Sequence, residues 1–182
     1  IDMTPVKSGE RYFYVWSHRK NIGTPLDTGS MLMIAEFDPV HPERLISEPK
    51  CLSRPLYGFE NTEHTINNEG PYAFYYHNKI YLAYSGGDAR GYLYAIGMLT
   101  ANDGDDLCDL SVWEKAKTPI ASFATIPGEY GPGHNSFFWD RDQNLWIAYH
   151  AVTSFEEKIV SSGMRRVYFE QDKTPRFDVI VE

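Results

Sequence analysis

Long hydrophobic runs and excess positive charge are both missing from this sequence. No stretch in its 182 residues approaches the roughly 18 consecutive apolar residues that a membrane-spanning helix needs, so we expect no transmembrane segment. Lys and Arg together number 17 against 25 Asp and Glu, which gives a net charge of −8 at pH 7. Nucleic acids and anionic lipid surfaces are bound through basic patches, so both are excluded as partners, whereas a neutral substrate fits this composition.

Cysteine is also scarce. Cys51 and Cys108 lie far apart and have no metal-ligand spacing, so two free or buried thiols are favoured over a disulfide, and the compartment stays open. No secretory leader is visible. The chain opens at Ile1 in the middle of a pattern and without an initiator Met, and we expect that Ile1 is not the natural N-terminus.

Aromatic residues, by contrast, are abundant. They make up 15% of the chain, and the apolar runs that contain them are short and broken by 14 Gly and 11 Pro. Aromatic residues are enriched in strands, and short runs bounded by Gly and Pro are typical of strands and turns. The sequence therefore predicts an all-β protein with no strong helix.

A segment of about seven residues recurs three times, each time as an apolar run that ends in an aromatic residue followed by a small polar residue or His. The three copies are Arg11–Ser17, Lys79–Ser85 and Asn144–His150. A polar turn precedes each copy, and an earlier short run precedes each turn, so each copy is predicted to be the second strand of a hairpin.

Two further strands are expected in each unit. The third strands are predicted at Met31–Phe37, Tyr92–Met98 and Arg165–Phe169. The fourth strands are predicted at Arg44–Ser47, near Thr118–Phe123 and at Phe177–Val181. Repeated four-stranded antiparallel sheets are typical of β-propeller blades, and the three blades are expected at residues 1–53, 67–123 and 131–182 of a single partial propeller domain. The alternative is a sandwich with similar hairpins.

Asp2, Glu69 and His134 open the three units. They recur at intervals of 67 and 65 residues, and each lies 15 or 16 residues before the end of its second strand. Because the first strand of a propeller blade is innermost, these side chains should converge at one mouth of the central channel. Three ionisable groups at matched positions are costly to bury without a purpose, so they form a candidate site.

Five segments in this order resemble glycoside hydrolase family 43. They are Ile1–Asp2, Asn67–Tyr72 with its Glu-Gly-Pro, Trp113–Lys115, Tyr130–Phe137 with Gly-Pro-Gly-His-Asn-Ser-Phe, and Ala148–Ala151. The resemblance extends over essentially the whole chain. It implies a five-bladed β-propeller that hydrolyses arabinosides and xylosides with inversion, as an α-L-arabinofuranosidase or β-xylosidase of the kind that degrades plant polysaccharides.

The resemblance also implies roles for individual residues. Glu69 matches the general acid, and Asp2 matches an Asp that keeps the acid protonated and orients the sugar. His134 matches a His that contacts a calcium ion or a water at the propeller axis, and Arg165 or Arg166 matches an Arg that touches the substrate.

Two further residues are candidates for contact with the sugar. Phe59 lies where the family often has an aromatic residue, and Asn135 follows His134 in the same motif. Inverting hydrolysis needs a protonated carboxyl for the leaving oxygen and a carboxylate, about 6.5–9.5 Å away, that activates water. The acid is thus assigned to Glu69.

The second carboxylate, the general base, has no counterpart in this chain, since the family carries it in an earlier blade. Three blades also cannot close a ring, because exposed edges and apolar walls would remain. Either further N-terminal blades complete the ring, or two copies form a six-bladed homodimer. The expected partner is a small saccharide, and the alternative function is a non-catalytic carbohydrate-binding propeller fragment.

Overall fold

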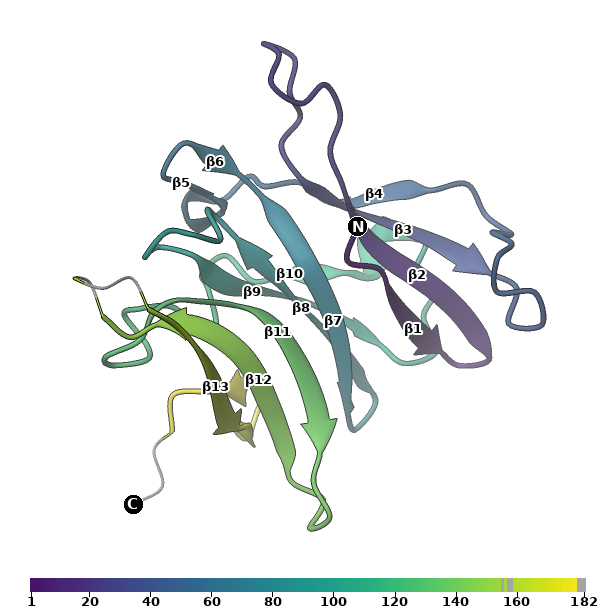
Figure 1. Cartoon of the computed structure of the whole chain (residues 1–182). Helices are drawn as coiled ribbons and strands as arrows, with labels where there is room; N and C mark the ends of the chain where they lie inside the picture. Colours follow the sequence, from purple (N-terminus) through teal and green to yellow (C-terminus); the bar gives the residue numbers. More distant parts are fainter. Residues whose placement is uncertain (155, 157–158, 180–182) are drawn as a thin grey trace.

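The protein folds almost entirely as antiparallel β-sheet (Figure 1). The computed structural model describes residues 1–154, 156 and 159–179. The first sheet has the order β1-β2-β3-β4. Its strands are β1 (Thr4–Ser8), β2 (Arg11–His18), β3 (Met31–Phe37) and β4 (Lys50–Ser53). The second sheet has the order β10-β9-β8-β7. Its strands are β7 (Asn68–Tyr76), β8 (Lys79–Gly86), β9 (Ala95–Asn102) and β10 (Glu114–Lys115).

The third sheet has the order β11-β12-β13, so it has three strands within the described residues. They are β11 (Tyr130–Trp139), β12 (Leu145–Val152) and β13 (Val160–Arg166). The smaller elements are two short hairpins and two single-turn 3-10 helices: β5 (Asn61–Thr62) with β6 (Thr65–Ile66), β14 (Tyr168–Phe169) with β15 (Pro175–Arg176), η1 (Gly58–Glu60) and η2 (Leu110–Val112). None of the helices within the described residues is long or apolar enough to cross a membrane.

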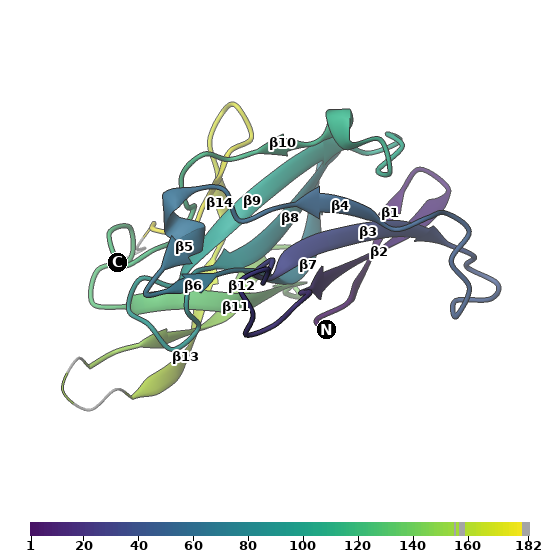
Figure 2. The same ribbon diagram turned by 90° about the horizontal axis from the view of Figure 1, so that it is seen from above.

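The first strands of the three sheets lie side by side. β7 contacts β1 on one side and β11 on the other, and the later strands of each sheet spread away from this centre (Figures 1 and 2). This arrangement is that of successive propeller blades. The predicted all-β propeller class is therefore confirmed.

Two hydrophobic cores hold the three sheets together. The core between the first and second sheets contains Phe13, Val15, Leu32 and Ile34 from one side, and Ile80, Leu82, Tyr84 and Leu99 from the other. The core between the second and third sheets contains Phe74, Tyr81, Ile96, Phe137, Leu145, Ile147 and Tyr149. The central sheet therefore supplies side chains to both cores from opposite faces.

The burial of the second strands follows from these positions. In β8, every residue after Lys79 is buried, because both faces of its sheet are covered. In β2 and β12 buried and half-buried residues alternate, because only one face of each outer sheet is covered.

The predicted second strands agree with β2, β8 and β12, and the predicted third strand Met31–Phe37 is β3. Several other predicted positions are wrong. The fourth strand of the first sheet is Lys50–Ser53, because Arg44–Ser47 lies in the connection before it and only Leu45 forms a bridge, to Phe37. In the second sheet the third strand is Ala95–Asn102, and β10 precedes the predicted fourth strand, of which only Ala121 bridges β9.

The end of the chain also differs from the prediction. The third strand of the last sheet is Val160–Arg166, and the predicted segment Arg165–Phe169 is divided between its end and β14. The described part of Phe177–Val181 contains no strand, and residues 180 and 181 lie outside the described residues. The signal failed here because β13 is polar and short of aromatic residues, with the sequence VSSGMRR.

Candidate functional site

An extra residue interrupts the first strand of each sheet at the same level. In the second sheet Glu69 pairs with Ser85 and Tyr72 with Ala83, so two residues of β7 oppose one of β8. In such a β-bulge the first of the two residues adopts the left-handed conformation, and here that residue is Gly70, with φ of 56°. The second is Pro71.

The third sheet repeats this bulge. Gly133 pairs with His150 and Ser136 with Ala148, so His134 and Asn135 oppose a single residue. His134 has a φ of 49° and is left-handed. Asp, Asn and His are the non-glycine residues that tolerate this conformation best, which accounts for a His at this position.

The first sheet carries the same feature at its entrance. The backbone groups of Ile1 and Ser17 exchange two hydrogen bonds of 2.8 and 2.9 Å, whereas Thr4 pairs with Val15. Asp2 and Met3 are the two extra-ladder residues, and Asp2 is left-handed with a φ of 55°.

The bulges correct the alignment of the three units. Gly70, and not Glu69, is the structural equivalent of Asp2 and His134, and Glu69 precedes the bulge as Gly133 does. Counting back from the second strands misses this because the β11–β12 turn spans residues 140–144, whereas the other two hairpins turn over two residues, 9–10 and 77–78.

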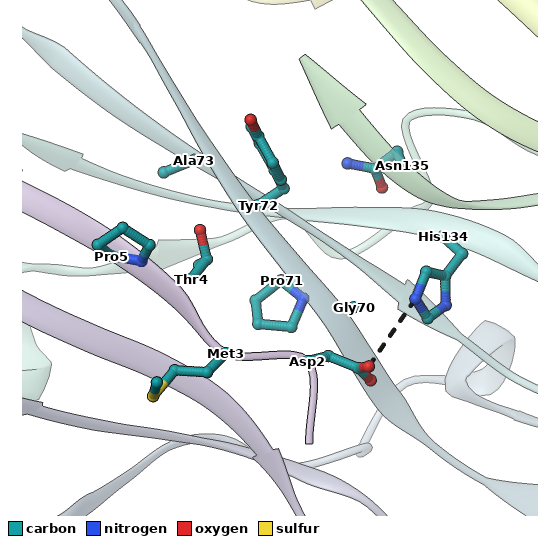
Figure 3. Close-up of a pocket in the computed structure, with 10 residues that line it drawn as sticks. All are labelled: Asp2, Met3, Thr4, Pro5, Gly70, Pro71, Tyr72, Ala73, His134 and Asn135. Carbon is teal, nitrogen blue, oxygen red and sulfur yellow. Dashed lines mark ion pairs between the residues drawn. The ribbon is translucent and has the colours of Figure 1, made fainter.

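The bulges direct side chains of the first and third sheets toward each other across the second. Asp2 Oδ1 lies 3.9 Å from His134 Nε2, and Figure 3 shows Gly70 beside this contact. A β-carbon on Gly70 would lie 3.4 Å from His134 Nδ1. The Ser17 hydroxyl also approaches Asp2 Oδ2, at 3.4 Å.

Glu69 is held by a buried tyrosine. The Tyr94 hydroxyl donates a hydrogen bond of 2.7 Å to Glu69 Oε1, and the Tyr94 side chain has no solvent exposure. The Tyr94 ring is stacked on His150, with centroids 5.6 Å apart and planes inclined by 8°. His150 in turn is stacked on His134 at 6.4 Å. A chain of rings therefore connects Glu69 to His134.

The electrostatics of the site join the same residues. Burial raises the pKa of Tyr94 well above its usual range, and the charges of Glu69 and then of Asp2 raise it further. Burial also lowers the pKa of His150, and the neighbouring His134 adds to this effect. Tyr94 is thus a neutral donor, and Asp2, Glu69 and His134 do converge on one region.

A pocket of about 410 Å³ lies where the three bulges meet (Figure 3). Its walls consist of the two residues of each bulge and four residues that follow them: Asp2, Met3, Thr4, Pro5, Gly70, Pro71, Tyr72, Ala73, His134 and Asn135. Asn135 is only 5% exposed, and neither atom of its amide group has a hydrogen-bond partner within the described residues. An unpaired buried amide is costly, so this amide is suited to bind a polar ligand.

The other predicted contact residues lie outside this pocket. Arg165 is paired with Glu129 at 2.7 Å and accepts no role at the bulges, since its Nε also donates to the Tyr149 hydroxyl. Arg166 is exposed and lies over the ring of Tyr168. Phe59 is half-buried in η1 and packs against the core between the first two sheets.

His134 was also predicted to contact calcium or water. Calcium takes six to eight oxygen ligands, and within the described residues no group of three or more His, Cys, Asp or Glu side chains could hold a metal ion. The residues around His134 therefore do not by themselves supply an oxygen-rich ligand set. Binding of calcium stays a prediction.

Sequence reasoning missed Tyr94 and Ser85. Tyr94 falls in the connection before β9, where its role depends on tertiary contact, and Ser85 Oγ accepts a 2.8 Å hydrogen bond from the His134 backbone N–H. One signal was available for Tyr94. The motif residue Gly133 has no left-handed φ to explain it, and a β-carbon there would lie 2.1 Å from the Tyr94 ring.

Comparisons with known proteins agree with this geometry. The family model described as glycosyl hydrolases family 43 matches residues 1–175. An extracellular exo-alpha-(1->5)-L-arabinofuranosidase of Streptomyces avermitilis is 28% identical over 98% of this chain and 37% of its own length. A protein of the same description from Streptomyces chartreusis is 34% identical over 79% of this chain and 42% of its own length.

Solved structures show the same fold. The crystal structure of an alpha-L-arabinofuranosidase from Lactobacillus brevis superimposes with a TM-score of 0.83 and 28% identity, over 97% of this chain and 55% of that one. A thermostable family-43 glycoside hydrolase gives a TM-score of 0.77 at 23% identity, over 97% of this chain and 56% of that one. This chain thus spans about half or less of the length of these relatives.

The contact between Gly133 and the Tyr94 ring predicts a loss of stability on substitution. We expect Gly133→Ala to lower the free energy of unfolding by about 1–3 kcal/mol, because its methyl group overlaps a fully buried ring. Gly58→Ala is the control, since a β-carbon at Gly58 meets nothing within 4 Å. Chemical denaturation measures both, and equal stability of the two variants would contradict the packing described here.

Proposed function

Since this chain belongs to family 43 of the glycosyl hydrolases, we propose that it is the acid-bearing part of an inverting glycosidase that acts on arabinose- or xylose-containing glycans. One observation carries the assignment of the acid: the Glu69 carboxyl is held at 2.7 Å by buried Tyr94, in the same charged cluster as Asp2. The names of the two Streptomyces relatives and of the Lactobacillus brevis structure favour arabinofuranosides among these substrates.

The proposed chemistry gives each residue a separate task. Glu69 donates its proton to the glycosidic oxygen as the bond to the sugar breaks. Asp2 keeps Glu69 protonated by charge repulsion and contacts the sugar, and His134 fixes the position of Asp2 from the opposite side. A second carboxylate, supplied from outside this chain, takes the proton of the attacking water.

Replacement of the acid tests this proposal. With the protein expressed at its natural length, we expect Glu69→Gln to lower kcat on nitrophenyl α-L-arabinofuranoside by about 10²–10⁴-fold, because an amide cannot donate the proton. Initial rates on the arabinofuranoside, the β-xyloside and the β-glucoside measure activity and preference together.

Glu48→Gln is the matched control, since Glu48 is exposed and lies in the connection before β4. Full activity of Glu69→Gln would remove Glu69 from the reaction. A wild-type protein that binds these sugars and hydrolyses none of them would favour the non-catalytic carbohydrate-binding module.

Asn135 is proposed to bind the sugar through its unpaired amide. We expect Asn135→Leu to raise KM about tenfold and to leave the free energy of unfolding unchanged or slightly higher, because no internal hydrogen bond is lost. Asn144→Leu is the contrasting control. It removes bonds to Asp140 in a remote turn and should cost stability without a change in KM. An unchanged KM for Asn135→Leu would refute the role.

The outer faces of the first and third sheets indicate how the ring is completed. Tyr14, Trp16 and the 61% exposed Met3 line a hollow on the first face, and Met164 is 66% exposed on β13 at the other end. Apolar patches of this kind mark interaction surfaces. We propose that these faces are covered, either by further blades or by a second copy of the chain. The greater length of the relatives supports further blades.

Light scattering tests whether the faces are adhesive. We expect the isolated 182-residue chain to associate at micromolar concentration, and Met3→Lys with Met164→Lys to weaken that association. Leu26→Lys changes an equally exposed side chain in the β2–β3 connection and should have no effect. A strictly monomeric wild-type chain would contradict both ways of completing the ring.

A further inference from the structure

The contact between Tyr94 and Glu69 distinguishes the two oxygens of the proposed acid. Tyr94 donates to Glu69 Oε1 at 2.7 Å, and its side chain is fully buried. Because burial and the nearby Glu69 both raise the pKa of Tyr94, the phenol keeps its proton throughout the range in which proteins stay folded. The hydrogen bond therefore has one direction, from Tyr94 to Glu69 Oε1.

This direction has a consequence for the protonated state of Glu69. A carboxylic acid carries one proton, and an oxygen that accepts a hydrogen bond from the buried phenol serves best as the carbonyl oxygen. The acidic proton then sits on Oε2. When the glycosidic bond breaks, the Oε2–H bond breaks with it, the proton passes to the leaving oxygen, and the carboxylate that remains keeps the Tyr94 hydrogen bond.

The Tyr94 ring has little freedom to move away from this position. On one side it fills the space where Gly133 has no β-carbon, at 2.1 Å from the β-carbon position. On the other it is stacked on His150, whose lowered pKa keeps that ring uncharged. The phenol is thus fixed by packing, and it fixes Glu69 in turn.

We propose that Tyr94 is a positioning residue that orients Glu69 so that the proton is carried on Oε2, toward the leaving group. This inference rests on the proposed function of Glu69 and adds a residue that acts through it. Tyr94 itself touches neither the glycosidic oxygen nor the attacking water.

The dependence of the rate on the leaving group tests this role. Substrates with very acidic leaving groups depart without a proton, whereas alkyl and sugar leaving groups need one. In the protein at its natural length, we expect Tyr94→Phe to slow hydrolysis of an arabinobiose or methyl arabinofuranoside about tenfold to hundredfold through kcat. The rate on the dinitrophenyl arabinofuranoside should change less than about twofold, and KM should stay the same.

The chain contains a closely matched control. Tyr84 is also fully buried and also donates a 2.7 Å hydrogen bond to a glutamate, Glu60, but Glu60 is paired with Lys115 instead of lying in the site. Tyr84→Phe should therefore lose stability without any selective effect on poor leaving groups. Phe fills the same space as Tyr at position 94, so the ring contacts with Gly133 and His150 are retained and the variant should fold.

A double-mutant cycle completes the test. If Tyr94 acts through Glu69, Tyr94→Phe should have no further effect in the Glu69→Gln background. An equal loss for all leaving groups, or a loss that adds to that of Glu69→Gln, would overturn the positioning role while leaving the acid assignment intact. Absence of hydrolysis by the wild-type protein would overturn the proposed function itself, and the role of Tyr94 with it.

Discussion

The site depends on one backbone irregularity that occurs three times. Each first strand gains a residue against its partner strand at the same level, and each gain begins with a left-handed residue: Asp2, Gly70 or His134. A regular strand would alternate its side chains between the two faces of the sheet. The bulges break that alternation where the sheets converge, so that Asp2 and His134 meet over Gly70, and all six bulge residues line one pocket.

The choice of residues follows from this constraint. Only the middle sheet has a glycine at the left-handed position, and a side chain there would press against the His134 ring. The flanking sheets have Asp and His, which tolerate the conformation and bring charge to the pocket. Glu69 needs no left-handed backbone, because it pairs regularly with Ser85 before the bulge begins. The proposed acid therefore stands on a regular part of the ladder, whereas its two charged neighbours stand on the bulges.

The sequence predicted the fold class, the second strands and β3, because aromatic runs with polar turns are strong local signals. It placed Asp2, Glu69 and His134 at one end of the sheets, but it made them equivalent, since the longer β11–β12 turn is invisible to a count of residues. Weak strands were misplaced for a related reason: β13 has the polar sequence VSSGMRR, and only its pairing with β12 makes it a strand. Tyr94 could not be found by spacing at all, because its contact with Glu69 is tertiary.

The buried ring of Tyr94 also changes how the Gly-Pro-Gly-His motif is interpreted. Gly133 and the ring occupy adjoining space, with no room for even one methyl group between them. The two positions therefore cannot vary independently: a larger residue at 133 requires a smaller one at 94, which would release Glu69. Among related sequences, the identity of these two positions should change together or not at all, and a chain that has lost one of them has lost the restraint on its acid.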